Sequence, residues 1–392
     1  MEEKVRGSVS VRAVVAAHEL AMAFAAEHRD DVAELAAVSP RFADLAVSFP
    51  GLLFALATGY GTAAARRKSS EQILNGKPLR EAADSLGLPF WLRRVVPEAF
   101  VAPIPVLPKS PEFTKRIANH IPDRRNRHKD WLDKIGRATR LGDDVFAAWL
   151  ASRRDLLLLI DGENDIGPLA LYAYYSNRPT TLAGGLVERR WDPEQQLQSA
   201  LWGCEMFLTR LAIEVLLSRP LPDSWARPGR AGEFEFKPIA TACDLLEEAR
   251  EMRNCVRRYV FKIALGECRL FSVRRNGERI ATLELIPSKR RGLPLVHQMR
   301  GRCNGPVPRS VREAALEWRS AHSRPLTECQ RAEILPDCEL WRRLTQPYET
   351  AKEVCLIAVD SPSITELETF VLKQWGIRAR MARPLWLRHE AA

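Results

Sequence analysis

The chain has 392 residues, with 59 Lys and Arg against 49 Asp and Glu, so its formal net charge at pH 7 is +10. A hydrophobic content of 46% with 28% charged residues is typical of a folded globular chain and excludes global disorder. No apolar run reaches the ~18 residues that a membrane-spanning helix needs, and the N-terminal residues lack the pattern of a secretory signal. We therefore expect a cytoplasmic protein of two or three domains that does not enter a membrane.

The eight cysteines all lie in the C-terminal half, and none forms a C-x-x-C pair. No paired histidines lie near them, so a zinc site of ordinary spacing is not expected. We expect free thiols, as in a reducing compartment, with no metal and no cofactor.

Residues 1–225 are predicted to form a mainly helical region. Their apolar residues recur at steps of three and four, and Pro40 and Pro50 divide this pattern into short helices. One hypothesis for the region is a scaffold whose helices bind a protein partner.

Residues 79–94 have the pattern of a helix-turn-helix. Gly87 would lie in the turn, and Arg93 and Arg94 would lie on the second helix, where they could contact DNA. A plain pair of helices explains the pattern equally well.

Prolines and glycines between residues 220 and 232 mark the clearest boundary in the chain. After it we expect a small α+β domain at 236–322. A C-terminal extension at 323–392 is expected to contain one strand, at 354–359, and one helix.

The α+β domain is predicted to open with a helix. Thr241 and Asp244 have the spacing of a capping box, with Asp in place of the usual Glu. An apolar stripe continues from there through Tyr259, and Gly266 is expected to end the helix.

An antiparallel sheet is predicted to follow this helix. The pair Asn276-Gly277 between two β-rich runs is a strong hairpin signal, because a type I′ turn needs two residues with positive φ. The expected strands are 270–273, 280–286 and 293–299, with a helix at 310–321. The fold class is therefore α+β, a sheet packed on helices after a helical region.

The hairpin turn also predicts which residues face each other. With Asn276 and Gly277 as the loop, Arg269 would lie opposite Glu284 and Phe271 opposite Thr282. On the third strand either Gln298 or its neighbour would join Glu284, and the sequence leaves this open.

Three ordered motifs in this domain resemble the PcfJ-like family over about residues 236–320. They are Cys255-Val-x-x-Tyr259, Thr282-x-Glu284 and Gln298 followed after five residues by Asn304. Many relatives carry His where this chain has Asn254, which argues against a mechanism that needs an imidazole there. The resemblance implies a bacterial protein linked to mobile genetic elements, but it implies no reaction.

The motif residues define a candidate catalytic pocket, made of Cys255, Tyr259, Glu284, Gln298 and Asn304. Cys255 would be a nucleophile, and Glu284 a general acid or base. The alternatives are that Cys255 is a buried apolar residue of the helix stripe and that Glu284 forms a cross-strand ion pair with Arg269.

Two basic clusters favour contact with nucleic acid, with Trp131 available to stack on a base. A solvated surface is the alternative explanation for each cluster. The residues concerned are Lys289, Arg290, Arg291, Arg300, Arg124, Arg125 and Arg127.

These observations support three hypotheses of function. The first is a PcfJ-like protein without an assigned activity that contacts nucleic acid through its basic loops. The second is an enzyme that uses the candidate pocket, and the third is the scaffold of the N-terminal helices.

Overall fold

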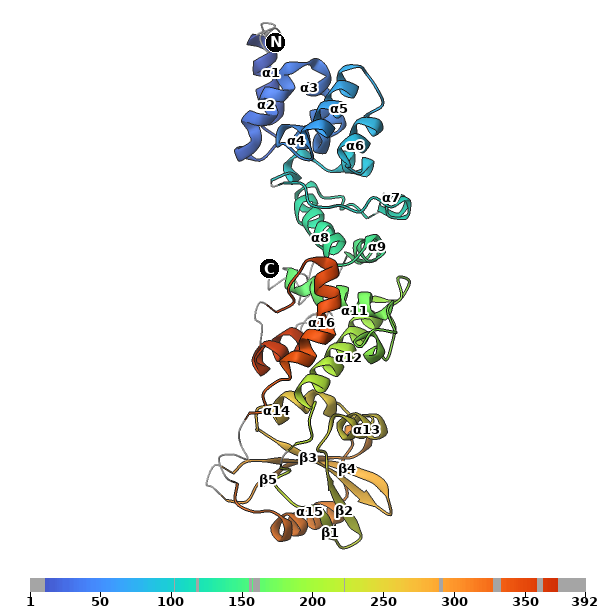
Figure 1. Cartoon of the computed structure of the whole chain (residues 1–392), viewed down its shortest axis with the longest axis vertical. Coiled ribbons are helices and arrows are strands. Elements are labelled where there is room, and N and C mark those ends of the chain that lie inside the picture. The colour runs from blue at the N-terminus through green and yellow to red at the C-terminus, as the bar shows by residue number, and fades with distance from the viewer. Residues whose placement is uncertain are drawn as a thin grey trace. The chain divides into compact units, whose positions relative to one another are not determined.

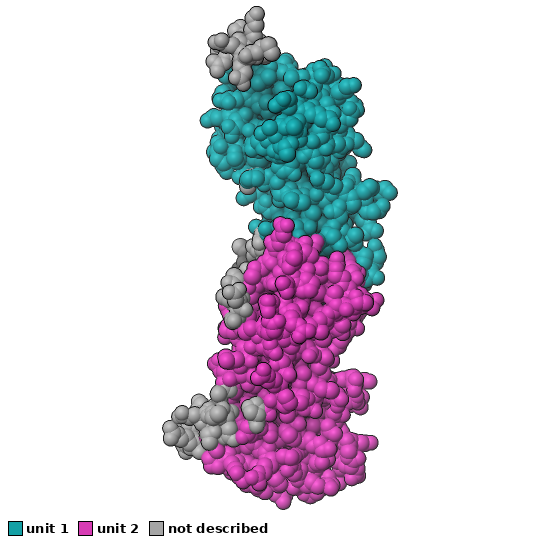
Figure 2. Space-filling view, viewed as in Figure 1, with its two compact units in different colours: residues 1–173, 192–197 teal, residues 174–191, 198–392 magenta. Residues whose placement is uncertain are grey.

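The computed structural model describes residues 11–101, 103–117, 120–154, 157, 163–221, 223–288, 292–326, 333–357 and 362–372. The chain forms two compact units, coloured separately in Figure 2. Unit 1 comprises residues 1–173 and 192–197, and unit 2 comprises residues 174–191 and 198–392. Over the ranges given above, no helix is long and apolar enough to cross a membrane.

Unit 1 is built from short helices joined by 3₁₀ turns, as the proline punctuation predicts. Its core includes α4, of which every residue except the last is buried, and the stacked rings of Phe24, Phe54 and Phe100. The helices are α1 (Val11–Ala21), α2 (Arg29–Val38), α3 (Pro40–Ser48), α4 (Pro50–Ala57), α5 (Ala63–Leu74), α6 (Leu79–Leu86), α7 (Pro111–Ile117), α8 (His128–Leu141), α9 (Asp144–Ala151) and the start of α11 (Glu163–Ser176).

The helix-turn-helix pattern at residues 79–94 is not formed. Helix α6 ends at Gly87 in the left-handed conformation, as expected. The segment after it is a 3₁₀ helix of five residues, Phe90–Arg94, whose Trp91 and Leu92 are buried. This segment is too short to act as a recognition helix, and its apolar side chains hold it in the core.

Unit 2 contains a five-stranded antiparallel meander between helices (Figure 1). Helix α15 lies on one face of the sheet, and α13 and α14 lie on the other. The α+β class is confirmed. The elements are α12 (Leu197–Leu216), β1 (Gly229–Ala231), β2 (Phe234–Pro238), α13 (Ala242–Met252), the 3₁₀ helix η6 (Val256–Tyr259), α14 (Val260–Ala264), β3 (Arg269–Arg275), β4 (Glu278–Ile286), β5 (Leu295–Arg300), α15 (Arg309–His322) and α16 (Cys338–Lys352).

The α15 face of the sheet is the apolar core of the domain. Trp318 of α15 is fully buried, and its ring stacks on Phe236 at 4.5 Å between centroids and meets Phe271 edge-on at 4.7 Å. The opposite face carries most of the polar side chains of β4. The two faces of the sheet therefore differ in polarity as well as in the helices that cover them.

The predicted turn forms, but the predicted register is wrong beyond its first two pairs. Asn276 and Gly277 have positive φ values, as a type I′ turn requires. A bulge between Val273 and Arg274 then shifts the pairing, so that Val273 faces Ala281. The shifted register places apolar residues opposite apolar residues on the α15 face, which the unshifted register would not do.

The helix that begins at Thr241 is also shorter than predicted. The capping box of Thr241 and Asp244 is present, but α13 ends at Met252, and Arg253 adopts the left-handed conformation with φ of 48°. The Asn254 side chain accepts a hydrogen bond from the Val256 N–H, which competes with helix continuation. The chain therefore restarts as η6.

The C-terminal extension differs from the prediction. Helix α16 was not expected, and residues 354–357 of the expected strand at 354–359 are not extended strand, while the rest of that strand lies outside the described residues. A helix does begin at residue 364, after Ser363 and Glu366 exchange capping hydrogen bonds.

Candidate functional site

The five candidate residues all line one open pocket on the α13 side of the sheet. Its volume is about 390 Å³. The side chains come from η6 and the turn before it, from β3, β4 and β5, and from the loop after β5. We call this the polar pocket, and its described lining is Asn254, Cys255, Val256, Tyr259, Leu270, Thr282, Glu284, Gln298, Arg300 and Asn304.

Glu284 is the most buried polar side chain of this pocket. It pairs with Gln298 on β5, which resolves the choice that the sequence left open, and with Leu270 on β3. A bulge at Glu284 in the β4–β5 ladder leaves His297 out of the pairing, and its Nδ1 lies 2.9 Å from the Glu284 Oε2. The Lys262 ammonium lies 3.9 Å from Oε1. The carboxylate thus has a histidine on one oxygen and a distant cation on the other.

The expected ion pair between Glu284 and Arg269 does not form. The bulge between β3 and β4 places Arg269 opposite Leu285 instead. The Arg269 guanidinium donates to the carbonyls of Asp223, Ile263 and Cys268, and it lies over a tryptophan ring. Arg269 therefore has a structural role, since it holds the end of α14 and the neighbouring loops together.

Tyr259 keeps its proton at neutral pH. Burial, and then the charge of Glu284, raise the pKa of the Tyr259 phenol to about 12. Gln298 donates a hydrogen bond to the same oxygen, and the Lys262 ammonium lies 5.1 Å from the centre of the ring. Because the oxygen accepts from Gln298, its own O–H remains available as a donor.

Burial of Cys255 in the apolar stripe is a further expectation that the structure corrects. The thiol is exposed, because the helix break at Arg253 removes Cys255 from the stripe. The Asn304 Nδ2 lies 3.9 Å from its sulfur. Asn304 and its neighbour Cys303 both have positive φ, in a loop closed by a hydrogen bond from the Gly301 N–H to the Gly305 carbonyl.

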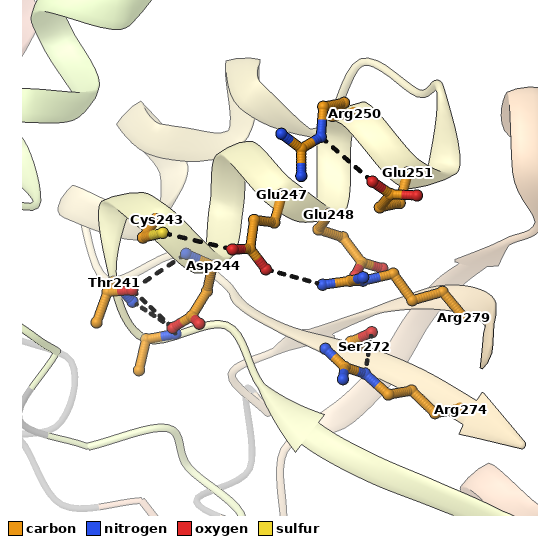
Figure 3. A network of polar contacts seen from close by, with 11 residues as sticks. Thr241, Cys243, Asp244, Glu247, Glu248, Arg250, Glu251, Ser272, Arg274 and Arg279 are labelled. Atoms are coloured by element: carbon orange, nitrogen blue, oxygen red, sulfur yellow. Dashed lines mark hydrogen bonds and ion pairs between the residues drawn. The ribbon is translucent and has the colours of Figure 1, made fainter. Parts of the chain in front are cut away.

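A buried polar network supports one wall of the pocket, and sequence reasoning missed it. Glu248 on α13 is almost fully buried and accepts hydrogen bonds from Arg279 at 3.0 Å and from the Thr282 hydroxyl at 2.7 Å. Thr282 in turn accepts from the Asn254 amide at 3.0 Å. Figure 3 shows Glu247 and Glu248 extending from α13 towards Arg279.

This network fixes Asn254, the residue that follows the helix break at Arg253. Because Asn254 is held to β4 through Thr282, the turn that presents Cys255 is tied to the strand that carries Glu284. A sequence signal for it existed: Glu248 follows the cap residue Asp244 by four positions, next to the apolar stripe, so it faces the sheet.

In the described part of the chain, no group of three or more His, Cys, Asp or Glu side chains could hold a metal ion. Cys268 lies near Glu284 but is a buried thiol, and its pKa is raised to about 12 by burial and then by the Glu284 charge.

The predicted nucleic-acid residues lie in different places. Arg300 is exposed and lines the polar pocket, whereas Lys289, Arg290 and Arg291 lie outside the described residues. The other three, Arg124, Arg125 and Arg127, are exposed in unit 1. The expectation that Trp131 stacks on a base is wrong, because Trp131 is 2% exposed and packs edge-on against Trp91.

The fold and the pocket thus define a small α+β domain with a polar pocket between a broken helix and its sheet. Residues 229–315, which hold this sheet and the first half of α15, match the family model described as PcfJ-like protein, and the resemblance drawn from the motifs is confirmed. The rest of the chain matches no family model. Searches of curated proteins and of solved structures find no match.

The supporting network generates a stability prediction. Arg279→Ala removes the charged partner of the buried Glu248 and is expected to lower the free energy of unfolding by about 3 kcal/mol, because the carboxylate stays buried without compensation. Chemical denaturation measures this change. Arg275→Ala is the matched control, since Arg275 pairs with Glu233 at the surface and its loss should cost less than about 0.5 kcal/mol. Equal effects of the two changes would contradict the role of the network.

Proposed function

We propose that the polar pocket binds a small polar molecule and that Glu284 is its central hydrogen-bond acceptor and proton carrier. The observation behind this proposal is the position of Glu284, a carboxylate only 2% exposed at the base of an open pocket. Five further side chains of the recognised motifs that carry a heteroatom line the same pocket, namely Cys255, Tyr259, Thr282, Gln298 and Asn304.

The cost of burying Glu284 supports a functional role. A buried carboxylate costs several kcal/mol unless a close cation and hydrogen bonds compensate for it. Here the ammonium of Lys262 is 3.9 Å away, and the histidine that contacts the other oxygen is half-exposed. An apolar residue at this position of β4 would carry a smaller desolvation penalty. Buried charged groups of this kind concentrate at binding and catalytic sites.

The donors and acceptors around the pocket indicate the kind of ligand. The Glu284 carboxylate accepts hydrogen bonds, the protonated Tyr259 hydroxyl can donate one, and the side-chain amide of Asn304 can do both. Such a lining suits a ligand with N–H or O–H groups, and it is unsuited to an apolar one.

Proton transfer is the chemistry that we assign to the pocket. A carboxylate held in place by His297 can take a proton from a bound N–H or O–H group and return it. A Cys255 nucleophile would need an adjacent base, and His297 is not among the described residues that line the pocket. Glu284 is therefore the residue on which the proposed activity depends.

Binding of a panel of polar fragments, namely amines, amino acids and nucleosides, tests this proposal. Ligand-observed NMR on the full chain measures binding, and Glu284→Gln is expected to weaken the fragments that occupy the pocket by about tenfold, the loss expected for a charge-assisted hydrogen bond. Glu278→Gln, at the exposed first residue of β4, is the control and should leave binding unchanged.

The outcome that contradicts the proposal is equally specific. If fragments bind the wild-type chain and none responds to Glu284→Gln, the carboxylate is not the acceptor. If no fragment binds at all, the pocket is not a site for small polar ligands of this kind.

Contact with nucleic acid is a second proposal, in keeping with the link of PcfJ-like proteins to bacterial mobile elements. What favours it in the PcfJ-like segment is Arg300, an exposed cation on β5. Arg300→Gln should weaken retention of DNA or RNA, and retention should fall steeply as salt rises, because released counterions drive such binding. Retention that does not depend on salt would remove this proposal.

A further inference from the structure

A second pocket, of about 290 Å³, lies within unit 1 and is separate from the polar pocket. We call it the arginine pocket. Its walls come from the loop before α8, from the first turn of α8 and from the segment after α9. The described lining is His120, Pro122, Asp123, Arg124, Arg127, Asp130, Trp131, Arg154 and Leu157.

A buried histidine holds the arginine-bearing loop in place. The His128 Nε2 donates to the Pro122 carbonyl at 2.7 Å, and its Nδ1 accepts from the Val96 N–H at 3.3 Å. These two bonds fix the imidazole as the neutral tautomer with its proton on Nε2. The loop that presents Arg124 and Arg127 is thus anchored to the core at its start and continues directly into α8.

Positive charge dominates this pocket. Arg124, Arg127 and Arg154 line it, against two carboxylates, Asp123 and Asp130. The Asp130 carboxylate is already bonded at 2.7 Å to the ammonium of a lysine on the next turn of α8.

His120 also lines the pocket, and its pKa is lowered by burial and then by Arg154, Arg116 and Arg153, of which Arg154 lines the pocket. These arginines place His120 in a positive field. A site with this field favours an anion.

The apolar part of the pocket lining favours a small ligand over a nucleic-acid strand. Trp131 is buried, so its face cannot stack on a base of a passing strand. Its indole N–H is buried without a hydrogen-bond partner, which is uncommon for a buried donor. Pro122 and Leu157 complete the apolar part of the lining beside the arginines.

We propose that the arginine pocket binds a small phosphate ester. The phosphate would lie between Arg124, Arg127 and Arg154, because guanidinium groups match the geometry of phosphate oxygens. The organic part would lie against the apolar wall formed by Pro122 and Leu157. The inference goes beyond the proposed function, since it concerns the other unit and does not use Glu284.

Isothermal titration of the full chain with adenosine monophosphate, inorganic phosphate and adenosine tests this inference. We expect adenosine monophosphate to bind, inorganic phosphate to compete with it and adenosine to bind more weakly by about tenfold or more. Arg127→Gln and Arg124→Gln should each weaken adenosine monophosphate by about tenfold.

Arg125→Gln is the matched control. Arg125 lies in the same 3₁₀ turn, but its side chain pairs with Glu98 at the surface and does not line the pocket. All three arginines are exposed, so the variants should fold. The control should change binding by less than about twofold.

Four results would overturn the inference. One is the absence of binding by both phosphate-bearing probes, and another is adenosine binding as tightly as its phosphate ester. The third is an equal loss of adenosine monophosphate binding in Arg125→Gln and Arg127→Gln, together with binding of an oligonucleotide that adenosine monophosphate does not displace. These two results would show that the arginine surface binds a nucleic-acid strand. The fourth is loss of binding in Glu284→Gln, which would place the ligand in the polar pocket.

Discussion

One irregularity in strand pairing decides which side chains meet in the polar pocket. The bulge between Val273 and Arg274 shifts the β3–β4 ladder, so that Leu270 lies opposite Glu284 and Arg269 turns to the other face. Without this shift Arg269 would face the carboxylate and could neutralise it, and the sheet would have an ion pair in place of an open acceptor. The position of this bulge therefore decides whether Glu284 forms a cross-strand ion pair or lines a candidate site.

The second constraint is the break after α13. A continuous helix would have placed Cys255 in apolar packing, but the left-handed Arg253 ends the helix and Asn254 is bound to Thr282 of β4. The helix break and the sheet are held together by one polar network, which includes the buried Glu248. Presentation of the thiol and burial of the carboxylate are thus coupled through the same side chains.

The sequence predicted the parts of this domain that depend on neighbouring residues. The capping box at Thr241 and the turn at Asn276 and Gly277 are local, and both formed as expected. The bulge depends on packing against α15. The sequence did contain a pattern that favours it, because the shifted register pairs the apolar Phe271 with the apolar Leu283. Contacts that join separate strands, such as that of His297 with the carboxylate, could not be read from spacing alone.

The most direct test of the account is a pair of engineered cysteine cross-links in the hairpin. Leu270→Cys with Glu284→Cys is predicted to form a disulfide on mild oxidation, identified by mass spectrometry of peptides, because the two positions lie opposite each other. Arg269→Cys with Glu284→Cys should not form one, since its side chains point to opposite faces. A disulfide in the second pair and none in the first would contradict the register, and with it the polar pocket.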